Sequence, residues 1–389
     1  MLTADVSPVE LTRSMVRIPS ENPNGTEAAM AAFVAEWFGR LPGVELEVLE
    51  VMPGRPNVVA RLRGISNQPP LALLAHMDTV PLGDGWKTDP LGGEIVDGKL
   101  YGRGACDMKS GLAVAMMALA NAARSGRKPS RDLIVCATID EEGTHMLGVT
   151  DLVQRGILGS DTLVIATEPS DLKVVVAHKG LLWLEVQVRG KLAHAGNPQF
   201  GVDAIRAAAE FITGFKRAID ALPHRHPKLG RAEVTFSAIE GGIKTNVVPD
   251  FARLEMDIRL PPPLTIADIR ALSDKCAREA EVAVSGARIE CHQLNNDRPP
   301  VEADAANEFS KTVCKTVSAT TGAADVVDVF PAYTDASVVQ ARTGNQRCLV
   351  FGPGRLSEAH TADEYVPVEQ IEKSMVVLNA VVQRMCFSG

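Results

Sequence analysis

The chain lacks paired cysteines, an export signal and a membrane-spanning apolar run. Its seven cysteines are scattered and contain no C-x-x-C pair, which favours reduced thiols over a disulfide framework. The first stretch, "MLTADVSPVELTRSMVRIPS", has no basic start followed by an apolar core. The longest apolar-rich helical pattern, at about 111–123, is too short to span a bilayer. We therefore expect a soluble cytoplasmic protein with no membrane partner.

The chain also lacks a concentration of positive charge. It has 40 Lys and Arg against 48 Asp and Glu, so its net charge is −8, and the two signs are interspersed. Because a nucleic-acid-binding protein would show a basic stripe, we expect no nucleic-acid partner. A length of 389 residues is enough for two domains or for one large domain with an insertion.

Apolar strand patterns alternate with helical patterns over the first 180 residues. Strands are predicted at 57–64, 71–76, 132–139 and 162–167. Because these strands are apolar throughout, they indicate an α/β fold with a mostly parallel sheet covered by helices. Residues 181–297 follow the order βαββαβ instead, which is typical of a ferredoxin-like sandwich. We predict a first domain formed by 1–180 and 298–389, with residues 181–297 inserted as a second domain.

Acidic residues and histidines follow the predicted strands of the first domain or stand in its loops. They are His76, Asp78, Asp107, Glu141, Glu142, Glu168 and His360. Ligands of such sheets bind beyond the carboxyl ends of the strands, so we expect these side chains to meet at one edge. A single acid at a strand end is ordinary for a solvated loop. Five acids with two histidines would repel one another unless a cation neutralised them, and this donor set suits zinc or a related divalent ion.

The Gly-rich stretch "GRGACDMKS" has an alternative interpretation as a phosphate-binding loop. A P-loop requires Gly directly before its Lys, whereas Met108 stands before Lys109 in this chain. We therefore reject a nucleotide site at this position.

Six motifs, taken together, resemble one known family. "HMDTVP", "DPLGGEIVDGKLYGRGACDMKSG", "DEEG", "TEPS", "AHAG" and "AHTADEYVPV" are similar in order and spacing to the co-catalytic zinc aminoacylases and metallopeptidases. That family includes acetylornithine deacetylase, succinyl-diaminopimelate desuccinylase and a carboxypeptidase. The resemblance covers nearly the whole chain. It implies a zinc-exopeptidase-like catalytic domain whose inserted domain is a lid and a dimerisation domain.

The resemblance also implies two metal ions that share one carboxylate. His76, Asp107 and Glu168 would hold one ion, and Asp107, Glu142 and His360 would hold the other. The expected metal is zinc, with cobalt or manganese as alternatives. The peptide bond after Asp107 would be cis.

Glu141 and Asp78 would support the chemistry without binding metal. Two ions can hold a bridging water, lower its pKa and polarise an amide carbonyl. Glu141 would act as the general base that takes the proton of this water and later passes it to the leaving amine. Asp78 would orient the ring of His76 toward the metal.

Further positions match substrate contacts of the family. His194 would donate a hydrogen bond to the tetrahedral oxyanion from the partner subunit of a homodimer, although it could also be a histidine satisfied in a turn. Asn246 and Arg259 would grip a substrate carboxylate or the oxyanion, although Arg259 could simply cover a sheet face. Gly352 would shape the loop before His360 and belongs with the substrate-binding positions.

The leading functional prediction is removal of an N-acyl group from an amino acid by amide hydrolysis. A metallo-exopeptidase, either a carboxypeptidase or a dipeptidase, shares this chemistry and stays open as the alternative. An N-carbamoyl hydrolase usually carries histidine at the position of Glu168, and an aromatic aminohydrolase is a further possibility. A catalytically silent binding protein should have lost a ligand or the base, yet all of them are present. A structural zinc module would be closed by four Cys or His ligands.

Overall fold

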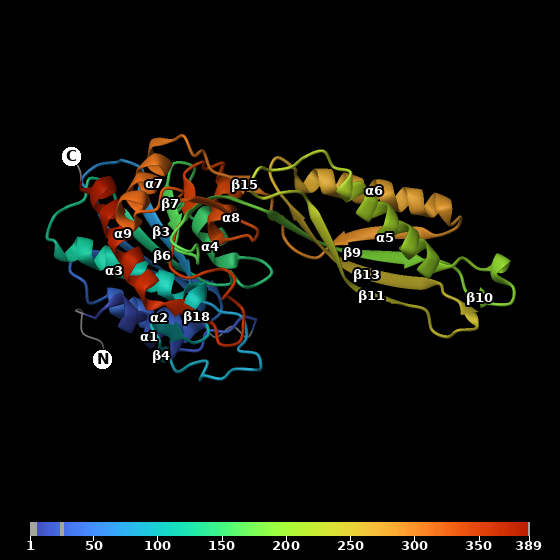
Figure 1. Ribbon diagram of the computed structural model, residues 1–389, viewed down its shortest axis with the longest axis horizontal. Helices are drawn as coiled ribbons and strands as arrows, with labels where there is room; N and C mark the ends of the chain where they lie inside the picture. Colours follow the sequence, from blue (N-terminus) through green and yellow to red (C-terminus); the bar gives the residue numbers. More distant parts are fainter. Residues whose placement is uncertain (1–5, 24–26, 388–389) are drawn as a thin grey trace. The chain divides into compact units, whose positions relative to one another are not determined.

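The computed structural model describes residues 6–23 and 27–387, which form two compact units (Figure 1). The first unit consists of the chain up to Ala177, of Glu302–Val329 and of the chain from Thr334 onward. The second unit consists of His178–Val301 and Phe330–Tyr333. Of the predicted catalytic domain, residues 1–5, 24–26 and 388–389 lie outside the described residues.

Helices make up much of both units. The helices of the first unit are α1 (Pro8–Val16), α2 (Glu27–Phe38), α3 (Ser110–Arg124), α4 (Leu147–Gln154), α7 (Glu308–Thr321), α8 (Asp335–Thr343) and α9 (Val368–Cys386), with an irregular turn η1 (Ala105–Lys109) before α3. The helices of the second unit are η2 (Pro198–Phe200), α5 (Ala204–Asp220) and α6 (Ile266–Ala283). Among the described residues, no helix combines the length and the apolar character needed to cross a membrane.

A nine-stranded sheet has the order β1-β2-β6-β3-β7-β17-β8-β15, and β16 pairs with β8. Its strands are β1 (Val44–Met52), β2 (Arg55–Leu62), β3 (Leu71–His76), β6 (Leu133–Thr138), β7 (Leu163–Ala166), β8 (Val174–His178), β15 (Val301–Glu302), β16 (Val327–Phe330) and β17 (Cys348–Val350). The four central strands, β6, β3, β7 and β17, run parallel. The pairs β1–β2, β2–β6 and β17–β8 are antiparallel. The prediction of a mostly parallel α/β sheet is confirmed for its centre, whereas the strand predicted at 57–64 joins as an antiparallel neighbour.

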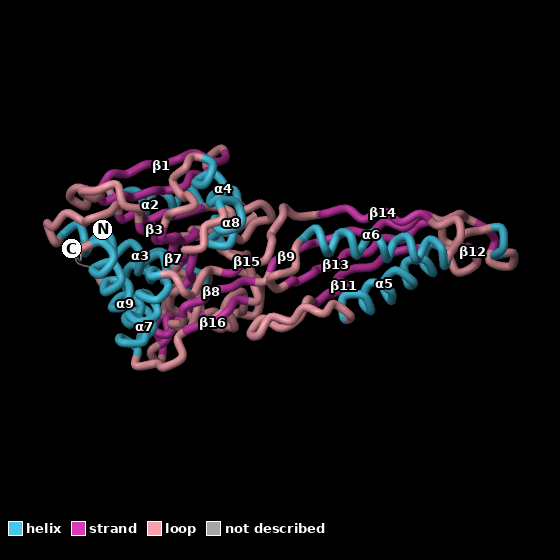
Figure 2. Tube along the Cα trace, turned by 90° about the horizontal axis from the view of Figure 1, so that it is seen from above, coloured by secondary structure: helices cyan, strands magenta, loops and turns pink. Residues whose placement is uncertain are grey.

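The central strands are buried on both faces because helices cover each side. Along β3, Leu71, Leu73 and Ala75 belong to the core that also contains residues of α1, α2, α3, α7 and α9. The alternate residues, Ala72 and Leu74, point to the opposite face, and α8 contacts β3, β7 and β17. Figure 2 shows α3, α7 and α9 on one side of this sheet and α4 and α8 on the other. A separate small sheet has the order β18 (Tyr365–Pro367), β5 (Lys99–Tyr101) and β4 (Ile95–Val96).

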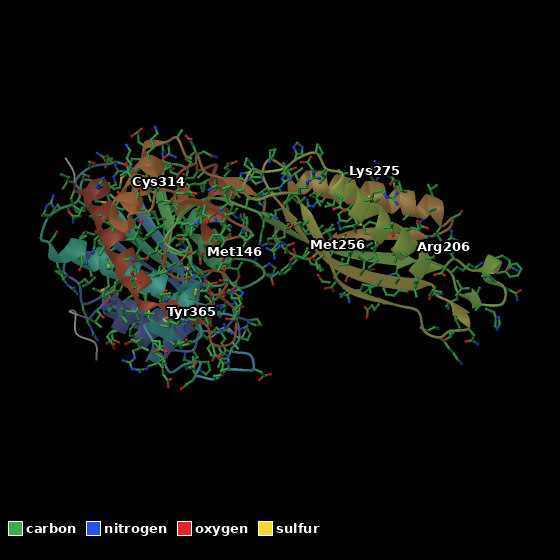
Figure 3. The ribbon with its side chains drawn as sticks, in the orientation of Figure 1. Met146, Arg206, Met256, Lys275, Cys314 and Tyr365 are labelled. Carbon is green, nitrogen blue, oxygen red and sulfur yellow. The ribbon has the colours of Figure 1, made fainter. Side chains whose placement is uncertain are left out.

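The second unit has the predicted order βαββαβ. Its strands β9 (Gly180–Arg189), β11 (Glu233–Gly241), β13 (Phe251–Leu260) and β14 (Arg288–Gln293) form one antiparallel sheet in the order β11-β13-β9-β14. Helices α5 and α6 pack against each other and share a core with alternate residues of β9 and β13, including Met256. Arg206 on α5 and Lys275 on α6 are exposed (Figure 3). A further two-stranded pair is formed by β10 (Ala193–His194) and β12 (Val247–Val248).

Candidate metal centre

The carboxyl ends of three neighbouring strands carry three of the five predicted ligands. His76 is the last residue of β3, and its parallel partners β6 and β7 end at Thr138 and Ala166. The loop after β6 contains Glu141 and Glu142, and the loop after β7 contains Glu168. Because parallel strands end at the same edge of the sheet, their loops deliver these side chains to one place.

Asp107 lies between two histidines that come from opposite ends of the sequence. One carboxylate oxygen, Oδ1, is 3.1 Å from His76 Nε2, and the other, Oδ2, is 3.4 Å from His360 Nε2. His76 Nε2 is also 3.7 Å from Glu168 Oε2, and His360 Nε2 is 2.8 Å from Glu142 Oε1. The structure therefore brings all five predicted metal ligands together as two groups that share Asp107.

The donor set fits divalent metal ions. One atom each of His76, Asp107 and Glu142 lie within 4.8 Å of one another. Glu168 is buried, and its Oε1 has no hydrogen-bond partner among the described residues. A buried carboxylate oxygen without a partner is costly unless a cation compensates it. Imidazole and carboxylate groups without thiolates are common ligands of zinc and related ions.

The electrostatics of the two histidines also favour a cation. Burial disfavours the charged ring of His76, but the negative charge of Glu168 and the hydrogen bond with Asp107 outweigh it and raise its pKa well above the usual value. Hydrogen bonds with Asp107 and Glu142 raise the pKa of His360 to about 10. Burial would raise the pKa of Asp107, but its bonds with His360 and His76 hold that pKa below its usual value. A metal ion would replace the protons on both rings, so metal binding should release protons.

Glu141 has the electrostatic environment of a proton carrier. Burial and the negative charges of Glu168 and Glu142 raise the pKa of Glu141 well above its usual value, against the opposing charge of His76. A carboxyl group whose pKa is raised toward the working pH can both accept and release a proton during a reaction. Glu141 is half-buried and follows directly on the buried Asp140.

Asp78 acts on the loop after β6 more directly than on His76. The ring atom Nδ1 of His76 lies 2.9 Å from the main-chain oxygen of Asp78 and 3.6 Å from its carboxylate. The carboxylate accepts hydrogen bonds from the main-chain N–H groups of Glu141 at 3.2 Å and Glu142 at 3.0 Å. The main chain of Asp78 thus orients the ring, while its side chain holds the loop that carries Glu141 and Glu142.

A buried polar network behind Asp78 was not anticipated from the sequence. Asn22 donates its side-chain amide to the carboxylates of Asp78 at 3.0 Å and Asp140 at 3.1 Å. Arg55 on β2 donates to Asp140 at 3.3 Å and pairs with Glu27 on α2. The position of Asp140, directly before Glu141 in "DEEG", was the one available sequence signal. The network ties the loop after β6 to the start of the chain.

The segment around Asp107 is shaped by the irregular turn η1. The peptide bond between Asp107 and Met108 is cis, as the resemblance implies. Lys109 is buried, and its ammonium donates to the main-chain oxygen of Ile18 at 2.8 Å. Its side chain therefore anchors the end of η1 on the protein itself.

Gly352 lies against the backbone that carries Glu168. A Cβ atom at this position would stand 2.4 Å from the carbonyl oxygen of Thr167 and 2.5 Å from that of Glu168. Glycine is therefore needed for the close approach of the two segments. Gly352 is buried, and its N–H donates to the hydroxyl of Ser170 at 3.0 Å.

Three predicted substrate contacts belong to the second unit. His194 is exposed on β10, and its Nδ1 accepts a hydrogen bond from the N–H of Gly196 at 3.0 Å. Asn246 is exposed close by, since its carbonyl accepts from the N–H of Ala195 at 3.0 Å. Arg259 on β13 donates to Asp257 at 2.7 and 3.0 Å.

Histidines and carboxylates gathered at the carboxyl edge of a largely parallel sheet form a candidate site for divalent metal ions, and the family that the chain matches consists of metal-dependent hydrolases that act on amide bonds. The chain matches the peptidase family M20/M25/M40 over residues 72–384. It belongs to this family, as the motifs led us to expect.

Similar proteins cover nearly the whole chain. The acetylornithine deacetylase of Vibrio cholerae serotype O1 is 30% identical over 375 residues, which cover 93% of each chain. The protein of the same name from Vibrio atlanticus is 30% identical over 362 residues, covering 91% of this chain and 90% of its own. Aminopeptidase PepT from Bacillus cereus has a TM-score of 0.78 at 22% identity and covers 97% of this chain and 98% of its own. The YXEP protein of Bacillus subtilis, a dinuclear metal binding peptidase, has a TM-score of 0.72 at 18% identity and covers 97% of both chains. These two structures share the fold.

Proposed function

We propose that the protein is a dinuclear metal-dependent hydrolase that removes the acyl group from an N-acyl amino acid. The observation that carries the proposal is Asp107, whose two carboxylate oxygens face His76 and His360 at 3.1 and 3.4 Å. A carboxylate that faces two ligand groups in this way suits two ions that share it. The acetylornithine deacetylases that resemble the chain favour a deacylase over an exopeptidase.

The metal ligands divide into two sets around Asp107. His76 and Glu168 would complete the site of one ion, and Glu142 and His360 that of the other. We propose zinc as the metal, because the donors are imidazoles and carboxylates, with cobalt or manganese as replacements. When bound, such ions polarise the amide carbonyl and lower the pKa of water.

Glu141 would move the proton during the reaction. Its carboxylate takes a proton from the attacking water, the C–N bond of the amide breaks, and Glu141 returns the proton to the leaving nitrogen. The products are a carboxylate and a free amine. The hydrogen bond from the N–H of Glu141 to the carboxylate of Asp78 holds the base in place for both transfers.

The contacts of the second unit would bind the substrate. Because Nδ1 of His194 accepts a hydrogen bond from Gly196, the neutral ring carries its proton on Nε2, where it can serve as a donor. We propose that the Nε2–H group of His194 of the partner subunit donates a hydrogen bond to the oxyanion in a homodimer. Asn246 and Arg259 would bind a substrate carboxylate or the oxyanion. In the first unit, Gly352 would shape the loop before His360.

We further propose a role for each of the two domains and a cellular compartment for the protein. Residues 1–180 and 298–389 would form the catalytic domain, and residues 181–297 would form a lid through which two copies dimerise. The cytoplasm is the proposed compartment, supported by seven cysteines that are all free thiols. Light scattering at several protein concentrations tests the dimer, and a variant without residues 181–297 should stay monomeric.

The first experiment measures metal content and amine release together. Purified protein loaded with Zn²⁺ is assayed for metal per chain and for free amine from N-acetyl and N-succinyl amino acids, N-carbamoyl amino acids and dipeptides. We expect two ions per chain and hydrolysis of the N-acyl substrates that a chelator abolishes. If the protein prefers dipeptides, the proposed activity changes from that of a deacylase to that of an exopeptidase. A protein that takes up no metal would overturn the proposal altogether.

A further inference from the structure

We propose that Glu364 is a positioning residue that sets the spacing between the metal ligands Asp107 and His360. The inference rests on the proposed two-metal site and extends it to a group that binds no metal itself. Glu364 is 1% exposed and lies four positions after His360 in the segment "HTADEY". It is therefore a carboxylate buried beside one predicted ligand and in contact with another.

One oxygen of Glu364 holds the main chain of the shared ligand. Oε1 accepts hydrogen bonds from the N–H groups of Cys106 at 2.9 Å and Asp107 at 3.0 Å. Both donors lie in η1, where the chain has no regular helical ladder to fix it. Because hydrogen bonds to an ionised acceptor are stronger than neutral ones, the carboxylate of Glu364 is a strong restraint on the main chain at Asp107.

The other oxygen of Glu364 connects to the loop of His360. Oε2 accepts from Arg103 Nη1 at 2.7 Å, and this arginine is itself buried. Arg103 also donates to the main-chain oxygens of Thr361 at 3.3 Å and Leu82 at 2.9 Å. The residue next to His360 is thus tied through Arg103 to the same carboxylate that holds Asp107.

The backbone around Glu364 is fixed by strand pairing. Its main-chain oxygen accepts from the N–H of Gly102 at 2.9 Å. The next residue, Tyr365 (labelled in Figure 3), begins β18 and pairs with Tyr101 on β5. The centroids of the two rings lie 5.5 Å apart. Strand pairing therefore fixes the main chain from which the carboxylate of Glu364 extends to η1.

This arrangement serves geometry more than stability. A buried ion pair such as Arg103–Glu364 is weak evidence of a gain in folding free energy, because both charges lose their hydration. Asp107 faces a histidine with each of its oxygens, so a shift of its main chain changes both distances at once. Glu364 is placed to prevent that shift while it restrains the loop of His360.

The test compares Glu364→Gln with a charge-matched neighbour. Gln keeps the shape of the side chain, but it has one acceptor oxygen where Glu364 has two. That oxygen can accept either from Arg103 or from the two N–H groups of η1, and the NH₂ group can accept from neither. We expect affinity for at least one of the two ions to fall about 10–100-fold, measured by chelator competition with Zn²⁺. The visible spectrum of the Co²⁺-loaded protein should also change, because it reports the ligand geometry. Glu364→Asp, which keeps the charge on a shorter side chain, should recover part of the affinity.

Asp363→Asn is the control. Asp363 also accepts from two main-chain N–H groups, those of Lys87 at 2.7 Å and Thr88 at 3.2 Å, but they belong to another loop. This variant should keep the wild-type metal affinity and spectrum. Unfolding of each metal-free variant is measured alongside, so that a loss of stability is separated from a loss of affinity.

Each outcome decides one claim. The positioning role is wrong if folded Glu364→Gln binds both ions with wild-type affinity and has the wild-type spectrum. If Glu364→Gln does not fold, the same criterion applies to Glu364→Asp. An equal loss in Asp363→Asn would also refute it, because the effect would then belong to the charge of the loop. If the wild-type protein binds no metal, the proposed function fails instead.

Discussion

The carboxylate of Asp78 accepts a hydrogen bond from the main-chain N–H of Glu142 at 3.0 Å, and its other oxygen accepts from the N–H of Glu141 at 3.2 Å. An acid two residues after the end of β3 thereby holds a proposed metal ligand and the proposed base, which both belong to the loop after β6. The two strands are parallel neighbours, so their ends meet. The proposed chemistry therefore depends on this loop as well as on the proposed ligands.

Asp78→Asn should give a folded protein with weakened metal binding. An asparagine offers one acceptor oxygen where Glu141, Glu142 and Asn22 now share two. We expect metal affinity to fall about 10–100-fold, as for other losses of groups that support metal ligands. Chelator competition measures the metal affinity. Asp84→Asn is the control, because Asp84 is exposed. Unchanged affinity and activity would refute the supporting role.

Glu141→Gln should separate metal binding from turnover. The glutamine fills the same space but cannot take a proton, so kcat should fall about 10²–10⁴-fold while both ions stay bound. Steady-state kinetics and metal content on the same sample measure the two effects. The neighbouring Glu142→Gln should lose metal instead. An active Glu141→Gln variant would remove Glu141 from the mechanism.

Gly111→Ala should disturb the strand end that leads to Glu168. A Cβ atom at Gly111, in the first turn of α3, would stand 1.8 Å from the carbonyl oxygen of Thr167, so one of the two segments must move. We expect a loss of unfolding free energy of about 3 kcal/mol or more, together with weaker metal binding. Gly214→Ala is the matched control in α5, because its Cβ would meet nothing within 4 Å. It should raise stability by about 0.5–1 kcal/mol, and denaturant unfolding compares the two.

Asp335→Asn should stabilise the metal-free protein at neutral pH and above. Burial raises the pKa of Asp335 to about 7 even though Thr138 donates to it at 2.6 Å. The folded protein then binds more protons than the unfolded chain between the usual pKa of 3.8 and about 7, so stability falls as pH rises through this range. The variant removes this loss, and its advantage should be present at pH 8 and absent near pH 4.

Denaturant unfolding in a chelator, repeated across pH, measures the effect of Asp335→Asn. Asp363→Asn provides a comparison of opposite sign, because main-chain hydrogen bonds from Lys87 and Thr88 lower the pKa of Asp363. Its variant should lose stability above the usual carboxyl pKa and lose little below it. An advantage of Asp335→Asn that does not change with pH would contradict the burial of a charge.

Much of the fold was predictable because local patterns control it. The apolar run at 71–76 is β3 with the same limits, since a strand buried on both faces needs apolar residues throughout. The order βαββαβ was likewise visible, because the apolar residues change between the 3.6-residue period of a helix and the two-residue period of a strand. The antiparallel direction of β2 was not predicted. Strand direction depends on connections and neighbours, which an apolar run does not encode.

The proposed ligands of the candidate site and the supporting Asp78 were named from the sequence, whereas the groups that hold Asp78 and Asp140 were not. Motif order pointed to His76, Asp107 and His360, but nothing in the sequence connects Asn22 to Asp78 or Arg55 to Asp140. These partners are far apart in the chain. Hydrogen bonds between distant polar groups depend on how the elements pack, which no local spacing reveals.

By itself, the sequence determined the main strands and helices, the family and the residue types of the candidate metal centre, because hydrophobic periodicity and motif spacing are local properties. Only the tertiary structure decided how these residues meet. It placed one carboxylate oxygen of Asp107 close to His76 and the other close to His360. It also placed the carboxylate of Glu364 within hydrogen-bond distance of two N–H groups of η1. Metal chemistry depends on distances of a few ångströms between such groups, and packing of the sheet, turns and helices sets those distances.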